Sequence, residues 1–385
     1  MKVCVNEITK SRCTIDTLHK SKDVEEYDLI ALGKAYFDNK EFKRCSHTLR
    51  GCVSQKGIFL RNFSSYLEGE KRKEEQLLET TDLNVHNKEL EGLNKFYIKL
   101  QNEGVELDGF NLYLFSLIQK QLNLYENSKV TLYNSIIKFP CNWSAWCDLL
   151  SLTNCMTTTD TTTTTLNEQI KIEHWIKDFY DGMLSLELQE NEKAIEIYER
   201  LNSLFPNSIY ILSQKAIAYY NLREFDTTEQ LFEEIQEKEP YRIEQLDTFS
   251  NILYVKENKA KLAILAQRTS EISKYSPETC CILGNYFSLK SDHEKAIIYF
   301  KRAIKLNNKY LSAWTLMGHE YVEMKNTRGA IEAYRNAVDI NNRDYRAWYG
   351  LGQTYELLKM PLYALYYYNK AATLKYVLYC LLSEY

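Results

Sequence analysis

Residues 277–310 read PETCCILGNYFSLKSDHEKAIIYFKRAIKLNNKY, and residues 311–344 read LSAWTLMGHEYVEMKNTRGAIEAYRNAVDINNRD. The two segments have the same length and align without a gap. Each has Gly at its eighth position, Ala at its twentieth and an aromatic residue at its twenty-fourth. Two helices that cross closely need small side chains at the crossing and a bulky ring to fill the space beside it. The spacing therefore predicts a pair of helices that repeats.

The same spacing extends through the C-terminal half of the chain. The first small position recurs every 34 residues, at Gly352, Gly318, Gly284, Ser250, Ala216 and Gly182. The second recurs at Ala364, Ala330, Ala296, Leu262, Thr228 and Ala194, and the aromatic one at Tyr368, Tyr334, Phe300, Phe232 and Tyr198. This pattern is typical of tetratricopeptide repeats, so we expect an all-α solenoid, a right-handed superhelix of antiparallel helix pairs.

Nine residues are expected to form the closest contacts of this packing. They are Gly284, Ala296, Phe300, Gly318, Ala330, Tyr334, Gly352, Ala364 and Tyr368.

The composition agrees with a helical repeat protein. Only 13 Gly and 5 Pro occur in 385 residues, too few turn residues for a β-rich fold. A net charge of −4 favours neither nucleic acid nor an anionic membrane as partner. The ten Cys show no C-x-x-C pair, and the N-terminus lacks the apolar core of a signal peptide. We therefore expect a protein of the nucleus and cytoplasm without disulfides.

The expected organisation has six parts. Residues 1–23 form an extension, 24–73 the first repeat-like helices, 74–92 a polar linker, 93–174 degenerate repeat-like helices with a Thr-rich loop at 157–165, 175–378 six in-phase units, and 379–385 a tail. The unit at 243–276 is the weakest, because Leu262 and Ala266 replace its small and aromatic residues.

No arrangement of residues predicts catalysis. The six His have no partner at metal-ligand spacing, and there is no Gly-rich phosphate loop and no nucleophile motif. We expect no catalytic residues, no metal and no cofactor. An enzyme is the least favoured class of function.

The first helices of stacked repeats line a concave surface, which is the usual binding surface of such proteins. The residues expected to face inward and to grip an extended peptide are polar or aromatic: Asn285, His319, Arg346, Tyr349, Gln353 and Glu356. The alternative is a solvated inner wall that binds nothing. Co-chaperone repeats that capture acidic C-termini carry lysines where Cys281, Thr315 and Tyr349 stand here, so that lysine clamp is absent. A general peptide-binding adaptor is therefore the second hypothesis, and a co-chaperone is a minor alternative.

A family resemblance adds to this prediction. Four runs carry it: PYRIEQLDTFSNILYV (240–255), ETCCILGNYFSLKSDHEKAIIYFKRAIKLN (278–307), YLSAWTLMGHEYVEMKNTRGAIEAYRNAV (310–338) and RDYRAWYGLGQTYELLKMPLYALYYYNKA (343–371). They resemble the subunit-eight family of the anaphase-promoting complex (cyclosome), as does YLEGEKRKEE at 66–75. Residues such as Asp247, Thr248, Met324 and Lys325 are not required by the repeat pattern, so their joint presence is specific.

The resemblance implies a non-catalytic scaffold subunit of a ubiquitin ligase that acts in the cell cycle. Its implied partners are other subunits of the complex, the C-box peptide of a coactivator, and a second copy bound through the N-terminal repeats between about 24 and 240. Neither nucleic acid nor a membrane is among them. After Thr373 the sequence departs from the family pattern and reads LKYVLYCLLSEY (374–385), which leads us to expect a C-terminally truncated chain.

Overall fold

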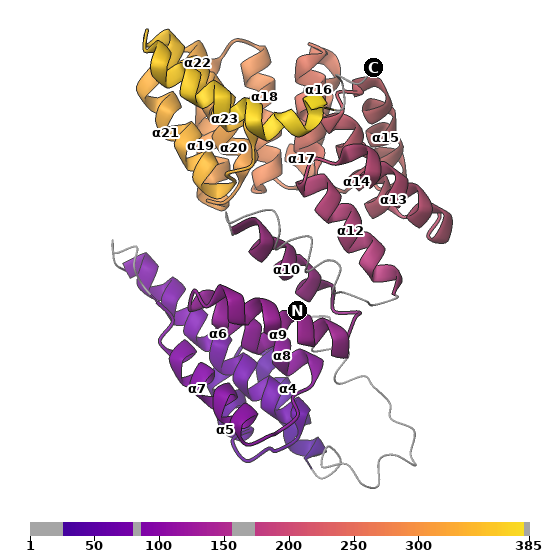
Figure 1. The fold of residues 1–385 in the computed structure, drawn as a ribbon, viewed down its shortest axis with the longest axis vertical. Coiled ribbons are helices and arrows are strands. Elements are labelled where there is room, and N and C mark those ends of the chain that lie inside the picture. The colour runs from indigo at the N-terminus through magenta and orange to yellow at the C-terminus, as the bar shows by residue number, and fades with distance from the viewer. Residues whose placement is uncertain (1–25, 80–85, 156–173, 381–385) are drawn as a thin grey trace. The chain divides into compact units, whose positions relative to one another are not determined.

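Helix pairs make up the described part of the chain (Figure 1). The computed structural model describes residues 26–79, 86–155 and 174–380, and within these ranges it contains helices and turns but no strand. Consecutive helices pack as antiparallel pairs. The prediction of an all-α tetratricopeptide-repeat fold is confirmed.

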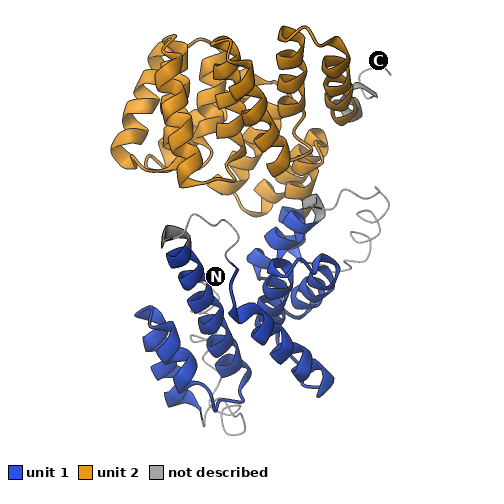
Figure 2. Ribbon diagram, turned by 90° about the vertical axis from the view of Figure 1, so that its left-hand side faces the viewer, with its two compact units in different colours: residues 1–180 blue, residues 181–385 orange. Residues whose placement is uncertain are grey.

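The chain divides into two compact units, residues 1–180 and 181–385 (Figure 2). The described helices that begin in the first unit are α4 (Tyr27–Asp38), α5 (Phe42–Thr48), α6 (Gln55–Glu79), α7 (Glu89–Asn102), α8 (Gly109–Gln121), α9 (Tyr125–Lys138), α10 (Trp143–Cys155) and α12 (Trp175–Glu187). The division between the units falls within α12.

The second unit continues with five further pairs. After α13 (Asn191–Leu204), they are α14 (Ile209–Asn221) with α15 (Phe225–Lys238), α16 (Leu246–Val255) with α17 (Lys259–Ile272), α18 (Pro277–Leu289) with α19 (His293–Leu306), α20 (Leu311–Glu323) with α21 (Thr327–Ile340), and α22 (Tyr345–Leu357) with α23 (Pro361–Cys380). In repeat order the even-numbered helices from α12 to α22 are the first helices of each unit and the odd-numbered ones are the second. First helices also contact the next first helix, as α16 does with α18 and α18 with α20.

A run of apolar and aromatic side chains forms the core of the first unit. Phe59 and Phe63 of α6 stack with their ring centres 5.6 Å apart. Leu114 and Ile118 of α8 are buried in the same cluster, together with Cys45 of α5. These side chains recur at helical spacing along their helices, which is why the N-terminal segment folds as repeat-like pairs although its sequence is degenerate.

Residues 74–92 were expected to form a polar linker, but helices occupy both ends of this segment. Helix α6 continues to Glu79 and α7 begins at Glu89. Just before the predicted linker, oppositely charged side chains of α6 form pairs: Arg72 Nε lies 3.1 Å from Glu68 Oε1, and Lys73 Nζ lies 3.7 Å from Glu70 Oε2. Such pairs three or four residues apart stabilise an exposed helix. The Thr-rich segment 157–165 and the extension 1–23 lie outside the described residues.

The turn inside each repeat has a recurring backbone conformation. Six non-glycine residues spaced 34 apart adopt a positive φ between 52° and 65°: Gln189, Arg223, Glu257, Ser291, Lys325 and Lys359. Each follows a first helix by one or two residues. The left-handed conformation ends that helix and reverses the chain, and it is the conformation that glycine adopts at least cost.

The unit at 243–276 keeps its phase with a different packing, as expected. Its first helix α16 has 10 residues, whereas α14, α18, α20 and α22 have 13 each. Leu262 and Ala266 are both buried in the core of this region. The core of this unit therefore contains a leucine and an alanine where the other units have a small residue and an aromatic ring.

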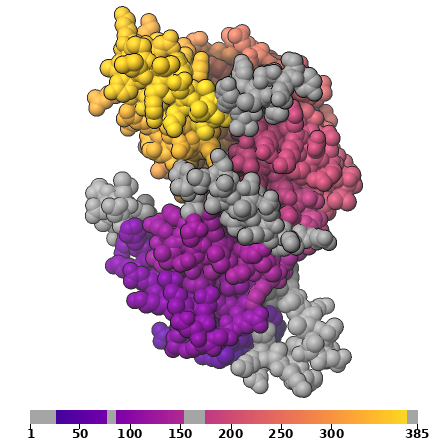
Figure 3. All heavy atoms as spheres, viewed as in Figure 1, coloured from indigo at the N-terminus to yellow at the C-terminus, as the bar shows by residue number. Residues whose placement is uncertain are grey.

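Helix α23 differs from the other second helices. It has 20 residues, against 14 in α21, and it continues through the expected start of the tail at residue 379. Leu362 is 82% exposed and Leu365 is 58% exposed. Atoms of this helix form part of the outer surface of the second unit, in yellow in Figure 3. The helix therefore presents apolar side chains to solvent.

Candidate functional site: the inner face of the second unit

The first helices of the second unit curve toward one another. Tyr220 lies at the end of α14 and Arg346 at the start of α22, and three helix pairs separate the two in sequence. Even so, Arg346 Cζ lies 5.1 Å from the centre of the Tyr220 ring. Such a contact requires a curved stack. We call the side on which these first helices meet the inner face.

Asn285 of α18 is the most enclosed of the six residues predicted to contact a peptide. Its side chain is 3% exposed. Nδ2 donates hydrogen bonds to Ser250 Oγ at 2.8 Å and to Asn251 Oδ1 at 2.7 Å, both on α16. Asn285 thus joins two adjacent first helices, and its amide is already satisfied within the protein.

His319 of α20 lies on the inner face with its side chain open to solvent. Its Nδ1 and the hydroxyl of Tyr334 lie 2.8 Å apart, at hydrogen-bond distance. Solvent reaches the ring, but the protein atoms crowded around it on the curved inner face partly desolvate it. This desolvation lowers the pKa of His319 to about 4, and the positive charge of Arg346 adds to the effect. At neutral pH the ring is uncharged, so it can exchange a hydrogen bond with a ligand but does not attract an anion.

Arg346 is half-buried and spans the inner face between two aromatic rings. Besides Tyr220, its guanidinium lies 6.0 Å from the ring centre of Tyr345. Burial alone would lower the pKa of Arg346, but Tyr220, Asp344 and Tyr345 outweigh it and raise the pKa. Burial likewise opposes ionisation of Tyr345, yet its pKa is lowered by Arg346 and by a hydrogen bond with Arg223. The cation is thus held by groups of α14 and α22 together.

The other three predicted residues lie close together and are open to solvent. Tyr349, Gln353 and Glu356 are exposed and follow one side of α22, at intervals of four and three residues. The Tyr368 hydroxyl donates a hydrogen bond to Glu356 Oε2 at 2.6 Å, and the rings of Tyr368 and Tyr349 have centres 5.3 Å apart. We call Tyr349, Gln353 and Glu356 the α22 strip. It combines an aromatic face, an amide and a carboxylate, a set that suits a peptide with a basic side chain.

Two polar clusters on the inner face were not predicted from the sequence. The first surrounds the buried Asp247 of α16: burial raises its pKa, against the opposing effect of hydrogen bonds from the side chains of Tyr310 and Ser312. The second surrounds the buried Glu320, which accepts from Ser288 Oγ at 2.7 Å. The sequence could have drawn attention to Asp247, because the repeat pattern does not require an acidic residue at that position. No feature of the neighbouring sequence distinguished Glu320 from the other glutamates of the chain.

His293 completes the second cluster. Its Nδ1 lies 2.8 Å from Glu320 Oε2, and it belongs to the second helix α19. The cluster therefore joins α18, α19 and α20 through side chains alone.

Three of the nine residues predicted to pack are glycines, and each lies against the aromatic ring predicted beside it. A Cβ atom added at Gly318 would lie 2.5 Å from the Tyr334 ring, and one at Gly352 would lie 2.5 Å from the Tyr368 ring. One at Gly284 would overlap the Phe300 ring. Such distances are shorter than any real contact between carbon atoms, so these positions require glycine. Ala296, Ala330 and Ala364 are buried.

Metal and membrane features were also sought in the described residues. They contain no group of three or more His, Cys, Asp or Glu side chains placed to hold a metal ion. Nor does any helix among them have the length and apolarity needed to span a lipid bilayer.

Comparison with known proteins assigns the family. The model of the family "Anaphase promoting complex subunit 8 / Cdc23" matches residues 6–216. Models of tetratricopeptide repeats match residues 277–310 and 318–359. The two sets of matches fall in different parts of the chain and agree with the fold described above.

Whole-protein relatives give the same result. The chain is 48% identical to anaphase-promoting complex subunit 8 of Arabidopsis thaliana over 264 residues, which are 68% of this chain and 44% of that protein. It is 45% identical to the human cell division cycle protein 23 homolog over 259 residues, 65% of this chain and 42% of that protein. The chain thus spans about half the length of the curated relatives it matches.

A solved structure shares the fold. The crystal structure of the APC/C hetero-tetramer Cut9-Hcn1 superposes with a TM-score of 0.67, covering 90% of this chain and 65% of that one, at 18% identity. On the match to residues 6–216 and these identities, the chain belongs to the anaphase-promoting complex subunit 8/Cdc23 family.

Proposed function

We propose that the protein is a non-catalytic scaffold subunit of the anaphase-promoting complex, which mediates subunit assembly and coactivator docking in cell-cycle-regulated ubiquitination. The observation that carries the proposal is the family match over residues 6–216, continued by stacked repeat pairs. Stacked pairs offer long surfaces and a concave face, which suit assembly rather than chemistry.

The α22 strip is the proposed contact for the C-box peptide of the coactivator. Glu356 would pair with a basic side chain, the Gln353 amide would bond the peptide backbone, and the Tyr349 ring would pack against an aliphatic stem or a cation. His319 and Arg346 border the same face. Asn285 is assigned a structural role, because the residue is buried and both hydrogens of its side-chain nitrogen are used within the protein.

A matched pair of variants tests this contact. We expect Gln353→Ala to weaken binding of a synthetic C-box peptide by about three- to tenfold, the effect of one hydrogen bond of about 1 kcal/mol. Gln267→Ala is the control, because Gln267 is exposed on the second helix α17 and its side chain donates to Glu271 of the same helix. Equal affinity of both variants, measured by fluorescence anisotropy, would remove the α22 strip from the binding site.

Homodimerisation through the N-terminal repeats, between about residues 24 and 240, is a further part of the proposal. In support, Tyr27, Leu29 and Leu32 of α4 are 67%, 44% and 45% exposed, which leaves apolar area for a partner. Light scattering during size-exclusion chromatography should give twice the chain mass. The variant Tyr27→Glu should shift the mass toward the monomer, and a monomeric wild type would refute this part.

Affinity purification distinguishes the scaffold from a general adaptor. Several identified subunits of the anaphase-promoting complex should copurify with the tagged chain. Recovery of a single peptide ligand without them would favour the adaptor. A co-chaperone is disfavoured because the positions of its lysine clamp hold Cys281 and Thr315, both buried, and Tyr349. The proposed location is the nucleus and cytoplasm, which imaging of a fluorescently tagged chain would test.

A further inference from the structure

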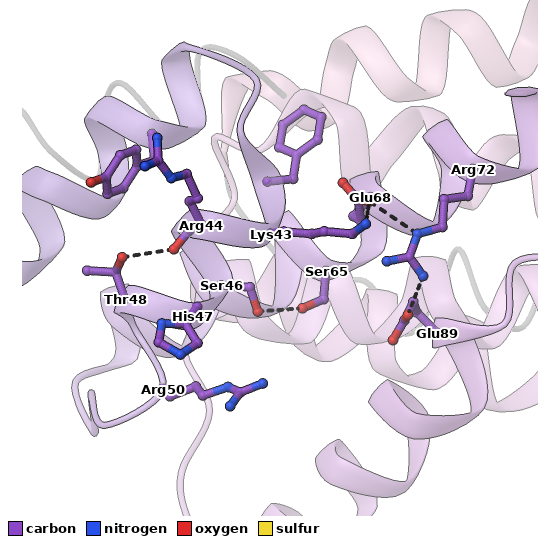
Figure 4. A pocket seen from close by; sticks show the side chains of 12 residues that line it. Lys43, Arg44, Ser46, His47, Thr48, Arg50, Ser65, Glu68, Arg72 and Glu89 are labelled. Carbon is purple, nitrogen blue, oxygen red and sulfur yellow. Dashed lines mark hydrogen bonds and ion pairs between the residues drawn. The ribbon is translucent and has the colours of Figure 1, made fainter.

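A pocket of about 670 Å³ lies in the first unit, inside the range 24–240 proposed for homodimerisation but not lined by the α4 residues named there. Helices α5 and α6 form most of it, and Glu89 of α7 closes one end (Figure 4). The lining combines basic side chains with three hydroxyl groups: Lys43, Arg44, His47, Arg50 and Arg72 are joined by Ser46, Thr48 and Ser65. The acidic lining residues are Glu68 and Glu89.

The pocket belongs to a basic segment of an acidic chain. Residues 34–61 contain seven lysines and arginines but only two acidic residues, whereas the whole chain has a net charge of −4. Local charge of this kind, against the sign of the whole chain, creates a positive potential that attracts an anion.

Internal ion pairs neutralise only one end of the pocket. At that end Lys43 Nζ lies 3.3 Å from Glu68 Oε1, and Arg72 bonds both Glu68 at 3.1 Å and Glu89 at 3.3 Å. Figure 4 shows these side chains in a row. The two positive and two negative charges neutralise one another, so this end should not attract a charged ligand.

Within residues 26–79 and 86–155, the other end has an arginine and a histidine without an acidic partner. His47 and Arg50 leave the end of α5 and the turn after it, and within residues 26–79 and 86–155 neither forms an ion pair. Both are exposed to solvent. The hydroxyls of Ser46 and Ser65 lie 2.9 Å apart between the two ends, where Figure 4 shows them beside His47. An arginine, a histidine and two hydroxyls within one pocket form a set of donors for an oxyanion.

One further cation is already engaged with an aromatic ring. Arg44 NH1 lies 2.8 Å from Glu41 Oε2, and its Cζ lies 5.2 Å from the centre of the Tyr36 ring. Tyr36 and Phe42 add an apolar wall to the pocket. A ligand with an anionic group and adjoining aliphatic or backbone atoms would fit such a lining better than a free ion.

We propose that this pocket binds a peptide segment through one anionic side chain, either a phosphorylated serine or threonine or a carboxylate. Arg50 and His47 contact the anion. Of the two hydrogen-bonded hydroxyls of Ser46 and Ser65, the one that accepts from the other keeps its own hydrogen for the anion, and the neutral end of the pocket accommodates the neighbouring residues. A nucleic acid is disfavoured, because Glu68 and Glu89 place carboxylates in the same pocket and would repel further phosphates. The site is independent of the α22 strip, so either one can fail without the other.

The test measures fluorescence anisotropy of short fluorescein-labelled Gly/Ala peptides with the full chain. The three peptides carry one phosphoserine, one glutamate or one unmodified serine at the centre, and a single-stranded oligonucleotide is the fourth probe. The phosphoserine or the glutamate peptide should bind more tightly than the serine peptide, and the tighter of the two names the source of the anion. Added salt should weaken that binding, because the contact is between exposed charges.

Charge-reversal variants locate the site. Arg50→Glu should weaken binding of the anionic peptide about tenfold or more, while Arg50→Lys should retain most of it. Lys95→Glu is the matched control, because Lys95 is exposed on α7 of the same unit and does not line the pocket. Circular dichroism checks that each variant keeps its helix content. The proposal is overturned if Arg50→Glu and Lys95→Glu behave alike, if the serine peptide binds equally well, or if the oligonucleotide binds more tightly than both anionic peptides.

Discussion

Replacing Gly318 by Ala should destabilise the repeat formed by α20 and α21, although alanine is the better helix former. The new Cβ would lie 2.5 Å from the ring of Tyr334, which is fully buried. The ring has no room to retreat, because a Cβ on Gly350 of α22 would also lie 2.5 Å from it. Tyr334 is thus enclosed between the backbones of two first helices.

The expected loss of stability has three contributions, of which the third opposes the first two. Inserting a methyl group into a filled core costs about 1–3 kcal/mol. Loss of the contact between the Tyr334 hydroxyl and His319 Nδ1, now 2.8 Å, adds about 1 kcal/mol if the ring is displaced. The gain in helix propensity offsets about 1 kcal/mol. We therefore expect a net loss of about 1–3 kcal/mol.

Gly92→Ala is the control for this substitution. Gly92 lies in α7, and no atom lies within 4 Å of an added Cβ there. The same chemical change should stabilise this helix by up to about 1 kcal/mol. Because stacked repeats need not unfold as one unit, hydrogen exchange should be followed separately at α7 and at α20–α21, beside thermal melting. If exchange at α20–α21 were as slow in Gly318→Ala as in the wild type, the proposed crossing geometry would be refuted.

Three further predictions concern the inner face and its turns. Arg346→Ala should cost about 1 kcal/mol and speed hydrogen exchange at the end of α14, because the contact with Tyr220 is lost; unchanged exchange there would show that the contact does not hold the stack closed. Lys325→Gly should raise the free energy of unfolding of the α20–α21 repeat by about 0.5–1 kcal/mol, because the left-handed φ of 58° costs glycine less than lysine and the exposed side chain has little packing to lose. A fall in melting temperature would contradict this. His319 has a folded pKa of about 4, below the usual value of 6.5, so its contribution to stability is present above about pH 6.5 and is lost as the pH falls toward 4. Since the ring is open to solvent, screening limits the effect to about 1 kcal/mol, and His319→Gln should reduce the acid sensitivity of the melting temperature.

Repeat architecture was predictable because it depends on local spacing. A glycine or alanine where two helices cross, and a ring beside it, are needed in every unit regardless of its neighbours. The turn residues were not predictable in the same way. The left-handed positions 189, 223, 257, 291, 325 and 359 hold five different residue types and no glycine, so their period appears in the backbone and not in the residue identities.

The segment 74–92 shows the limit of composition as a signal. Its polar residues predicted a linker, but α6 continues to Glu79, and just before that segment Arg72 pairs with Glu68 and Lys73 with Glu70 along the same helix. Alternating charges support an exposed helix when opposite signs stand three or four residues apart.

From the sequence alone, the 34-residue interval determined the helix pairs, their crossing residues and the side of each first helix that faces inward. The tertiary structure decided which of those inward residues a ligand can reach. Asn285 is used between α16 and α18, Arg346 reaches Tyr220, and only the α22 strip, with His319 beside it, keeps its side chains exposed. The reason is physical: small rotations between successive pairs add up over the stack, and the resulting curvature, which no single repeat contains, brings residues 220 and 346 together.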